Sequence, residues 1–178
     1  MKTNFKIAFL FSLILVLSAG ISTAQTDASK TAKVKLKGIY IYSFAKNVYW
    51  PQDYSTGDFF IGVYGDNDLY SQLNNSYTDK LIGSQKIKIK FFNELDQIKD
   101  CHLLFVCEEK MKDIGSVRKK ISKQTLLVSE GENLVTTGSM INFIYIQSRL
   151  KFQVNKTKSE KNDLKIGQTL TKLAHSII

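Results

Sequence analysis

Residues 101–107 have the sequence CHLLFVC. The continuous apolar run over His102–Val106 is typical of a strand that is covered on both faces, as strands in parallel sheets are. Two other runs have the same character, FFIGVY at 59–64 and TLLV at 125–128. Because segments with helical periodicity separate these strands, the chain is expected to form an α/β sandwich.

The segment Thr31–Tyr49 predicts a helix with one buried face. Apolar residues recur along it at helical spacing: Leu36, Tyr40, Ile41, Phe44, Ala45 and Val48. Trp50-Pro51 ends the helix, because a residue that precedes proline is pushed out of the α region.

The other elements follow from the same periodicities. Asp66, Asn67 and Asp68 are suited to cap a short helix near Leu69–Leu73. Lysines alternate with apolar residues over Lys86–Phe92, which predicts a half-exposed strand with a wet, basic face. Further elements are expected as follows: a charged helical stretch at Glu109–Ile121, a polar loop at Gly131–Gly138, a hairpin of Met140–Ile146 and Leu150–Val154, and a final amphipathic helix built on Leu164, Ile166, Leu170, Leu173, Ala174 and Ile177.

The expected fold class is therefore α/β, a sandwich with a mixed, largely parallel central sheet flanked by helices and a C-terminal hairpin plus helix. No repeat or linker divides the chain. A single domain is accordingly expected over residues 25–178, after a signal peptide over residues 1–24.

The amino terminus has the order of a secretory signal peptide. Lys2 and Lys6 give a positive start, Ile7–Leu17 is an apolar run, and small residues lead up to Ala24. The run is shorter than the roughly 18 residues that a bilayer span needs, so an uncleaved anchor is the weaker alternative. We expect cleavage after Ala24 and a periplasmic location.

The composition excludes several classes of protein. The chain has 178 residues, a formal charge of +9, 43% hydrophobic residues, two Cys and two His, which argues against a disordered chain, a zinc finger or a Cys-rich scaffold. Arg118 and Arg149 are its only arginines, so no nucleic-acid partner is expected. Two groups of lysines are expected to form solvated faces, with contact to anionic lipid as the weaker alternative: Lys33, Lys35 and Lys37, and Lys156, Lys158, Lys161 and Lys165.

The two cysteines bracket one predicted strand. Cys101 and Cys107 are six residues apart, which is roughly 20 Å along a strand at about 3.3 Å per residue. A disulfide needs Cα atoms within about 7 Å. The two are therefore not expected to pair within a monomer, and both are predicted to be small buried hydrophobes. An intermolecular bridge stays open if Cys107 is exposed.

Residues suited to catalysis are scarce. Ser129-Glu130 lacks the Gly-x-Ser-x-Gly elbow that would make the serine a nucleophile. His102 and His175 have no carboxylate or cysteine at ligand spacing and are expected to be structural, with His175 in the final helix. No catalytic residue, metal ligand or cofactor is predicted, and the chain is not expected to be an enzyme.

Residues 42–51, YSFAKNVYWP, resemble the opening signature of the YfiR/HmsC-like periplasmic proteins, which has the form Y-x-F-x-K-x-V-x-W-P. Later features resemble the family in the same order: Phe60–Gly65, Gly83, Cys101–Val106, Leu126–Ser129, Gly138, Ile141–Phe143, Phe152–Asn155, and Leu164 through Leu170 to Ala174. The resemblance extends over residues 31–175.

The resemblance implies a small α/β domain, often dimeric, that tunes and usually inhibits an inner-membrane signalling protein from the periplasmic side. The implied partners are a diguanylate cyclase, which makes cyclic-di-GMP, or a histidine kinase. An outer-membrane lipoprotein able to sequester the inhibitor is a further implied partner. Better-known members carry additional cysteines in disulfides, so a redox mechanism is not carried over to this chain.

Two candidate sites follow. For partner binding the candidates are Phe44, Lys46, Trp50 and Pro51: Phe44 is expected mainly in the core, Trp50 as a core plug or an exposed anchor, and Lys46 on the polar face, where it could steer an acidic partner. The alternative function is a small-ligand sensor that uses a crevice at the strand ends near Gly65, Ser129 and Glu130. An unrecognised enzyme using Ser129, Glu108 or His102 is the third and least supported class.

Overall fold

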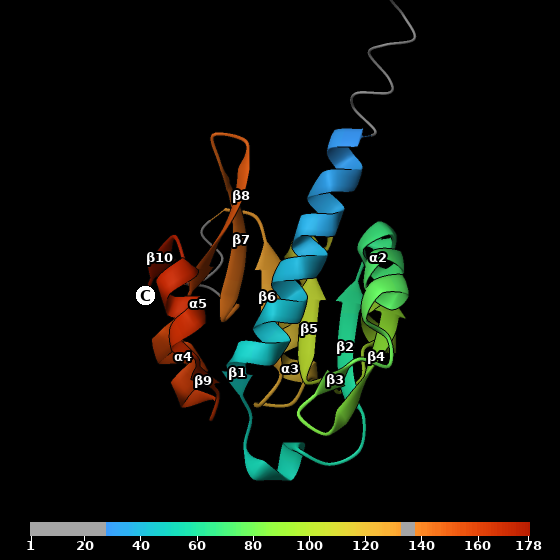
Figure 1. Ribbon diagram of the computed structural model, residues 1–178, viewed down its shortest axis with the longest axis vertical. Helices are drawn as coiled ribbons and strands as arrows, with labels where there is room; N and C mark the ends of the chain where they lie inside the picture. The colour runs from blue at the N-terminus through green and yellow to red at the C-terminus, as the bar shows by residue number, and fades with distance from the viewer. Residues whose placement is uncertain (1–27, 133–137) are drawn as a thin grey trace, which may run out of the picture.

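Five parallel strands form the middle of one sheet in the computed structural model, which describes residues 28–132 and 138–178 (Figure 1). Within those residues the sheet has eight strands in the order β10-β8-β7-β6-β5-β2-β4-β3. The parallel strands are β2 (Phe59–Tyr64), β4 (Gln85–Phe92), β5 (Leu103–Val106), β6 (Leu126–Glu130) and β7 (Ile141–Ile146).

The edges of the sheet are short or antiparallel. β8 (Arg149–Val154) returns from β7 as a hairpin, and β10 (Ser176–Ile177) adds to it in parallel. At the other edge, β3 (Leu81–Ile82) pairs antiparallel with β4. A separate two-stranded ladder joins β1 (Val48–Tyr49) to β9 (Lys165–Ile166).

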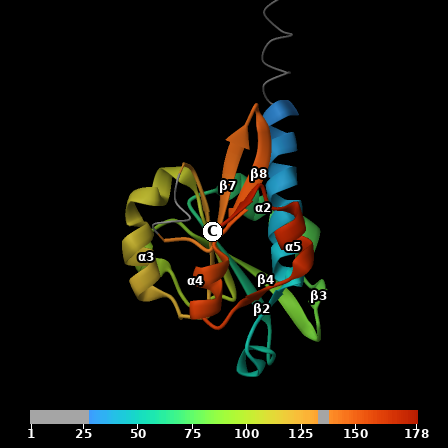
Figure 2. The same cartoon turned by 90° about the vertical axis from the view of Figure 1, so that its left-hand side faces the viewer.

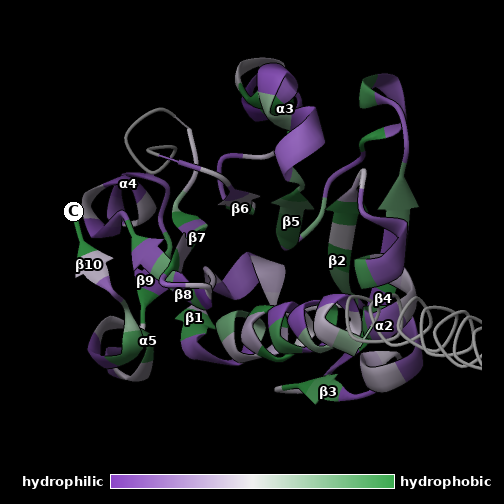
Figure 3. Ribbon diagram, turned by 90° about the horizontal axis from the view of Figure 1, so that it is seen from above, coloured by the Kyte–Doolittle hydropathy of each residue, from purple (hydrophilic) through white to green (hydrophobic). Residues whose placement is uncertain are grey.

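Helices cover both faces of the sheet (Figures 2 and 3). The first helix, described over residues 28–47, and α2 (Asn67–Tyr77) lie on one face, and α3 (Ile114–Lys120) lies on the other. The remaining helices are short: the 3-10 helices η1 (Gln52–Tyr54), η2 (Leu95–Gln97) and η3 (Glu108–Asp113), and the α-helices α4 (Lys156–Lys161) and α5 (Gln168–Leu173).

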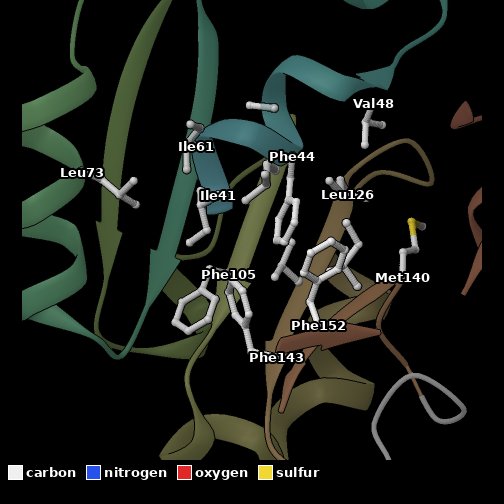
Figure 4. Packing of buried hydrophobic residues seen from close by; sticks show 14 of the residues in the cluster. Ile41, Phe44, Val48, Ile61, Leu73, Phe105, Leu126, Met140, Phe143 and Phe152 are labelled. Carbon is white, nitrogen blue, oxygen red and sulfur yellow. The ribbon is translucent and has the colours of Figure 1, made fainter. Parts of the chain in front are cut away.

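An aromatic cluster holds the first helix against the sheet (Figure 4). Phe44 is fully buried, and its ring centroid lies 5.0 Å from that of Phe152 and 5.5 Å from that of Phe143. Tyr40 packs on the same rings. A second apolar cluster on the opposite face lies under α3 and includes Leu104 and Val117. Burial of one fully enclosed aromatic or aliphatic side chain contributes about 1.5–3 kcal/mol, so these two clusters are the main source of stability.

The α/β sandwich, its largely parallel sheet and the closing hairpin are confirmed. The apolar strand runs that define the fold class coincide with β2, β5 and β6, and β5 is buried along its whole length. Part of the polar loop predicted at Gly131–Gly138 lies outside the described residues. The helix expected near Leu69–Leu73 is longer, and Asp66 caps it by accepting a hydrogen bond from the Leu69 N–H at 2.9 Å.

The buried stripe predicted for the first helix is confirmed at Ile41, Phe44, Ala45 and Val48 but is wrong at Leu36. Leu36 is 37% exposed, whereas Lys37, predicted on a solvated face, is only 8% exposed. The helix also ends before Val48, which enters β1. Gly38 is buried against α2, where an added Cβ would lie 3.3 Å from a side-chain atom of Gln72.

The predicted final amphipathic helix is wrong. That stretch instead forms β9, α5 and β10, and His175 is exposed beyond the end of α5. Gly167 separates the first two elements, because a Cβ at this position would lie 2.6 Å from the Asn47 carbonyl oxygen. Pairing of β9 with β1 and of β10 with β8 outweighs the local helical pattern.

The basic face predicted for Lys86–Phe92 is only partly exposed to solvent. Lys86 is exposed, but Lys88 and Lys90 are half-buried. The Lys90 ammonium lies 3.5 Å from the centroid of the Phe60 ring, a cation–π contact that keeps its stem against the sheet.

Both cysteines are free and buried, as predicted. Burial raises the pKa of the Cys101 thiol to about 12 and that of Cys107 to about 11. Cys107 is 2% exposed, so its thiol has neither the access nor the thiolate character that an intermolecular disulfide requires.

Gly62 in β2 allows the second cluster to close over the sheet. A Cβ there would lie within 2.9 Å of side-chain atoms of Leu104, Cys101 and Phe92. We expect Gly62→Ala to lower the free energy of unfolding by about 1–3 kcal/mol, measured by urea denaturation. Gly115→Ala is the matched control: nothing lies within 4 Å of its added Cβ, and alanine in α3 should leave stability unchanged or raise it by up to about 1 kcal/mol. Equal effects of the two substitutions would contradict this packing.

Candidate functional site

The order of the parallel strands creates a crevice at their carboxyl ends. β2 has β4 on one side and β5 on the other, so the chain leaves β2 and β5 toward opposite sides of the sheet. Open α/β sheets bind ligands at such a topological switch point, where the connections from adjacent strands run to opposite sides of the sheet. A cavity of about 540 Å³ lies there, between these strand ends and the first helix.

A buried lysine is the centre of this crevice. The Lys37 ammonium lies 2.7 Å from the Glu130 carboxylate and 3.3 Å from that of Asp66. The Tyr145 hydroxyl donates a hydrogen bond to the second Glu130 oxygen at 3.3 Å. The side chains of Lys37 and Glu130 are 10% and 9% exposed, so this ion pair joins the first helix to the end of β6 largely out of water.

The carboxylates keep the lysine charged. Burial alone would lower the pKa of Lys37, but Glu130 and then Asp66 together raise it above its ordinary value. Burial, followed by the negative charge of Glu130, raises the pKa of Tyr145. Lys37 is therefore an ammonium and Tyr145 a neutral hydrogen-bond donor at neutral pH.

The rest of the crevice is polar and more exposed. Lys30 pairs with Asp68 at 2.7 Å, and the Lys33 ammonium lies 5.5 Å from the centroid of the Tyr145 ring. Glu108 and Glu109 form the wall that follows β5, and both are exposed. The mixture of lysines and carboxylates is suited to hold a small polar molecule by charge and hydrogen bonding.

The structure brings together two of the three predicted crevice residues. Gly65 and Glu130 line the cavity, whereas Ser129 is fully buried and donates its hydroxyl proton to the Asn142 side-chain oxygen at 2.8 Å. Ser129 is therefore held by Asn142 inside the fold and does not line the crevice. Gly65 has a φ of +90°, and a Cβ on it would lie 2.5 Å from the Cys107 sulfur.

Lys37 was predicted to lie on a solvated face, so its place at the centre of the crevice was not predicted from the sequence. A signal was available, because Lys37 precedes Ile41 by four residues and so shares a helix face with Ile41 and Phe44. A lysine on an apolar stripe indicates a buried partner charge. In the described residues, no group of three or more His, Cys, Asp or Glu side chains is arranged to hold a metal ion.

The signature residues lie at the other end of the first helix, near the amino ends of the strands. Phe44 is wholly in the core and offers no surface. Trp50 is half-buried: its indole N–H donates to the Gln124 carbonyl oxygen at 3.0 Å, and its ring meets that of Phe59 edge-on at 5.1 Å. Lys46 is exposed and Pro51 is half-buried. Trp50 therefore acts mainly as a plug that closes this end of the hydrophobic core.

A second cavity, a groove of about 340 Å³, opens beside the plug. Trp50 and Phe59 line it on one side, and the turn from Ile82 to Gln85 lines it on the other. Lys46 and Tyr49 stand at its edge, and Tyr49 is 60% exposed.

His102 is a satisfied structural residue, as predicted. Its Nδ1 accepts a hydrogen bond from the Phe60 N–H at 3.1 Å, which leaves the proton on Nε2 for the Tyr54 carbonyl oxygen at 3.0 Å. The ring also stacks on Phe59, with centroids 4.4 Å apart. Both ring nitrogens of neutral His102 therefore have a hydrogen-bond partner.

A family model described as YfiR/HmsC-like matches residues 34–175. The chain therefore belongs to the YfiR/HmsC-like family, and membership is consistent with a regulatory protein. A comparison with curated proteins finds no match. Within the described ranges, no helix has the length and hydrophobicity needed to cross a bilayer.

Removal of the buried ammonium should destabilise the domain. We expect Lys37→Met to lower the free energy of unfolding by about 3–5 kcal/mol in urea, because it leaves the carboxylates of Glu130 and Asp66 without their cation. Lys37→Met combined with Glu130→Gln should recover part of the loss. Lys35→Met, at an exposed lysine of the same helix, is the control and should change little. A Lys37→Met protein as stable as the control would contradict a structural role for the pair.

His102 should make stability depend on pH. Burial lowers the pKa of His102 below its ordinary 6.5. The unfolded chain therefore takes up a proton before the folded one does, and the free energy of unfolding falls as pH drops below 6.5. Urea titrations between pH 7 and about pH 5 should show this loss, with a smaller slope for His102→Gln. An identical slope in the variant would assign the effect to other groups.

Proposed function

We propose that this chain is an exported periplasmic protein that binds and tunes, by inhibition, an inner-membrane signalling protein such as a diguanylate cyclase or a histidine kinase. The family match over residues 34–175 carries this proposal. The signal-like order of residues 1–24 supports export. An outer-membrane lipoprotein and a second copy of the chain are further partners that the proposal includes.

The surface we assign to the signalling partner surrounds the end of the first helix. Lys46 and Tyr49 are exposed there, and Trp50 presents one side to the groove while its other side plugs the core. Aromatic side chains fixed by packing are frequent anchors of protein interfaces, because little side-chain entropy is lost when a partner binds. Phe44 takes part only indirectly, by holding the helix in place.

A small-ligand sensor is the second candidate function, favoured by the cavity at the switch point. A molecule bound between Lys33 and the exposed Glu108 and Glu109 would contact the first helix and the end of β5 together. Ligand binding to the native state raises its thermal stability by mass action. A metabolite-dependent rise in melting temperature that is lost on substitution of Glu108 would support this function.

The regulatory proposal is tested by crosslinking the tagged full-length protein in intact cells and identifying captured envelope proteins by mass spectrometry. We expect an inner-membrane cyclase or histidine kinase among them. A tagged form with residues 1–24 deleted is the control, and it should stay inside the cell and lose the capture. Recovery of self-crosslinks alone would contradict the proposal.

A further inference from the structure

Two lysines converge on one aromatic ring beside the groove. The Lys46 ammonium lies 5.7 Å from the centroid of Tyr42, and the Lys80 ammonium lies 5.8 Å from the same centroid. Tyr42 stacks on Tyr77 with centroids 4.5 Å apart, and Lys80 is also 4.9 Å from the Tyr77 centroid. The first helix and the segment after α2 thus bring two cations to one aromatic platform.

No carboxylate of the described residues neutralises this pair. Neither Lys46 nor Lys80 forms a salt bridge there, and the neighbouring Asp79 is already held by Lys88 at 2.6 Å. The cation–π contacts with Tyr42 and Tyr77 keep both ammonium groups at this platform, although both lysines are exposed. A segment that carries carboxylates along this platform would therefore gain from both positive charges.

The lysine pair stands next to an apolar groove. Lys46 and Ile82 both line the groove, and Lys80 precedes Ile82 by two positions in the chain. Tyr49, which is 60% exposed, lines the groove together with Trp50 and Phe59, and Leu81, which is 54% exposed, directly precedes the lining residue Ile82. A basic edge and an apolar floor therefore occur at one place, at the exposed sheet edge formed by β3.

We propose that this groove binds an acidic segment of the signalling partner, with Asp or Glu side chains on Lys46 and Lys80 and an apolar side chain over Trp50. The inference rests on the proposed function and adds the chemistry of the partner's contact. A protein segment fits better than a lipid surface or a nucleic acid, because the two cations adjoin a concave apolar site instead of spreading over a flat face.

The test uses the full-length protein in its own envelope, with a photo-crosslinking amino acid at Leu81. We expect the crosslinked peptides of the captured signalling protein to contain Asp or Glu next to an apolar residue. Lys46→Glu combined with Lys80→Glu should reduce this capture by at least about tenfold, because the reversed charges repel the same segment.

Lys112→Glu combined with Lys119→Glu is the matched control. Both of these lysines are exposed, they lie in η3 and α3, and the pair makes the same change in net charge. The control should keep its capture. Urea unfolding of each purified variant verifies that the domain is folded.

The outcomes separate this inference from the proposed function. Capture of the signalling protein that is unchanged by Lys46→Glu/Lys80→Glu, or that falls equally in the control, overturns the acidic-segment inference and leaves the regulatory function standing. Crosslinks at Leu81 only to lipid, nucleic acid or a second copy of the chain also overturn it. Absence of any signalling protein, both here and with the tagged wild-type chain, overturns both.

Discussion

The packing of the first helix across the parallel sheet is the constraint on which the rest of the structure depends. Phe44 lies among the rings of Tyr40, Phe143 and Phe152, which come from the helix and from two strands of the closing hairpin. This contact fixes the rotation of the helix. That rotation turns Lys37 toward Glu130 at one end and places Trp50 over Phe59 at the other.

The lysines at the two ends of the helix differ in whether a carboxylate neutralises them. At the carboxyl ends of the strands, the Lys37 ammonium is neutralised by Glu130 and Asp66 and serves mainly to hold the helix on the sheet. At the amino ends, Lys46 and Lys80 share an aromatic platform without a carboxylate among the described residues. Charge that is neutralised within the fold stabilises it, whereas charge left without a partner on a preformed groove is available for recognition.

The sequence predicted what depends on local pattern and missed what depends on distant contacts. The apolar run at His102–Val106 indicates a central strand because every position in it is buried in any parallel sheet. The stretch after Leu164 has an equally good helical pattern, but Ile166 pairs with Val48 across the molecule. The position of Lys37 on the apolar stripe indicates a buried partner charge, but no local pattern identifies that partner as Glu130, 93 positions away in the chain.

Hydrogen–deuterium exchange of the full chain, alone and with the periplasmic part of the signalling protein that crosslinking captures, tests the central claim most directly. The account predicts slower exchange on binding in residues 46–50 and 80–85, around the groove, with little change at Glu108, Glu109 and Glu130. Protection confined to the crevice at the carboxyl ends of the strands, or to α3 and α4, would contradict it.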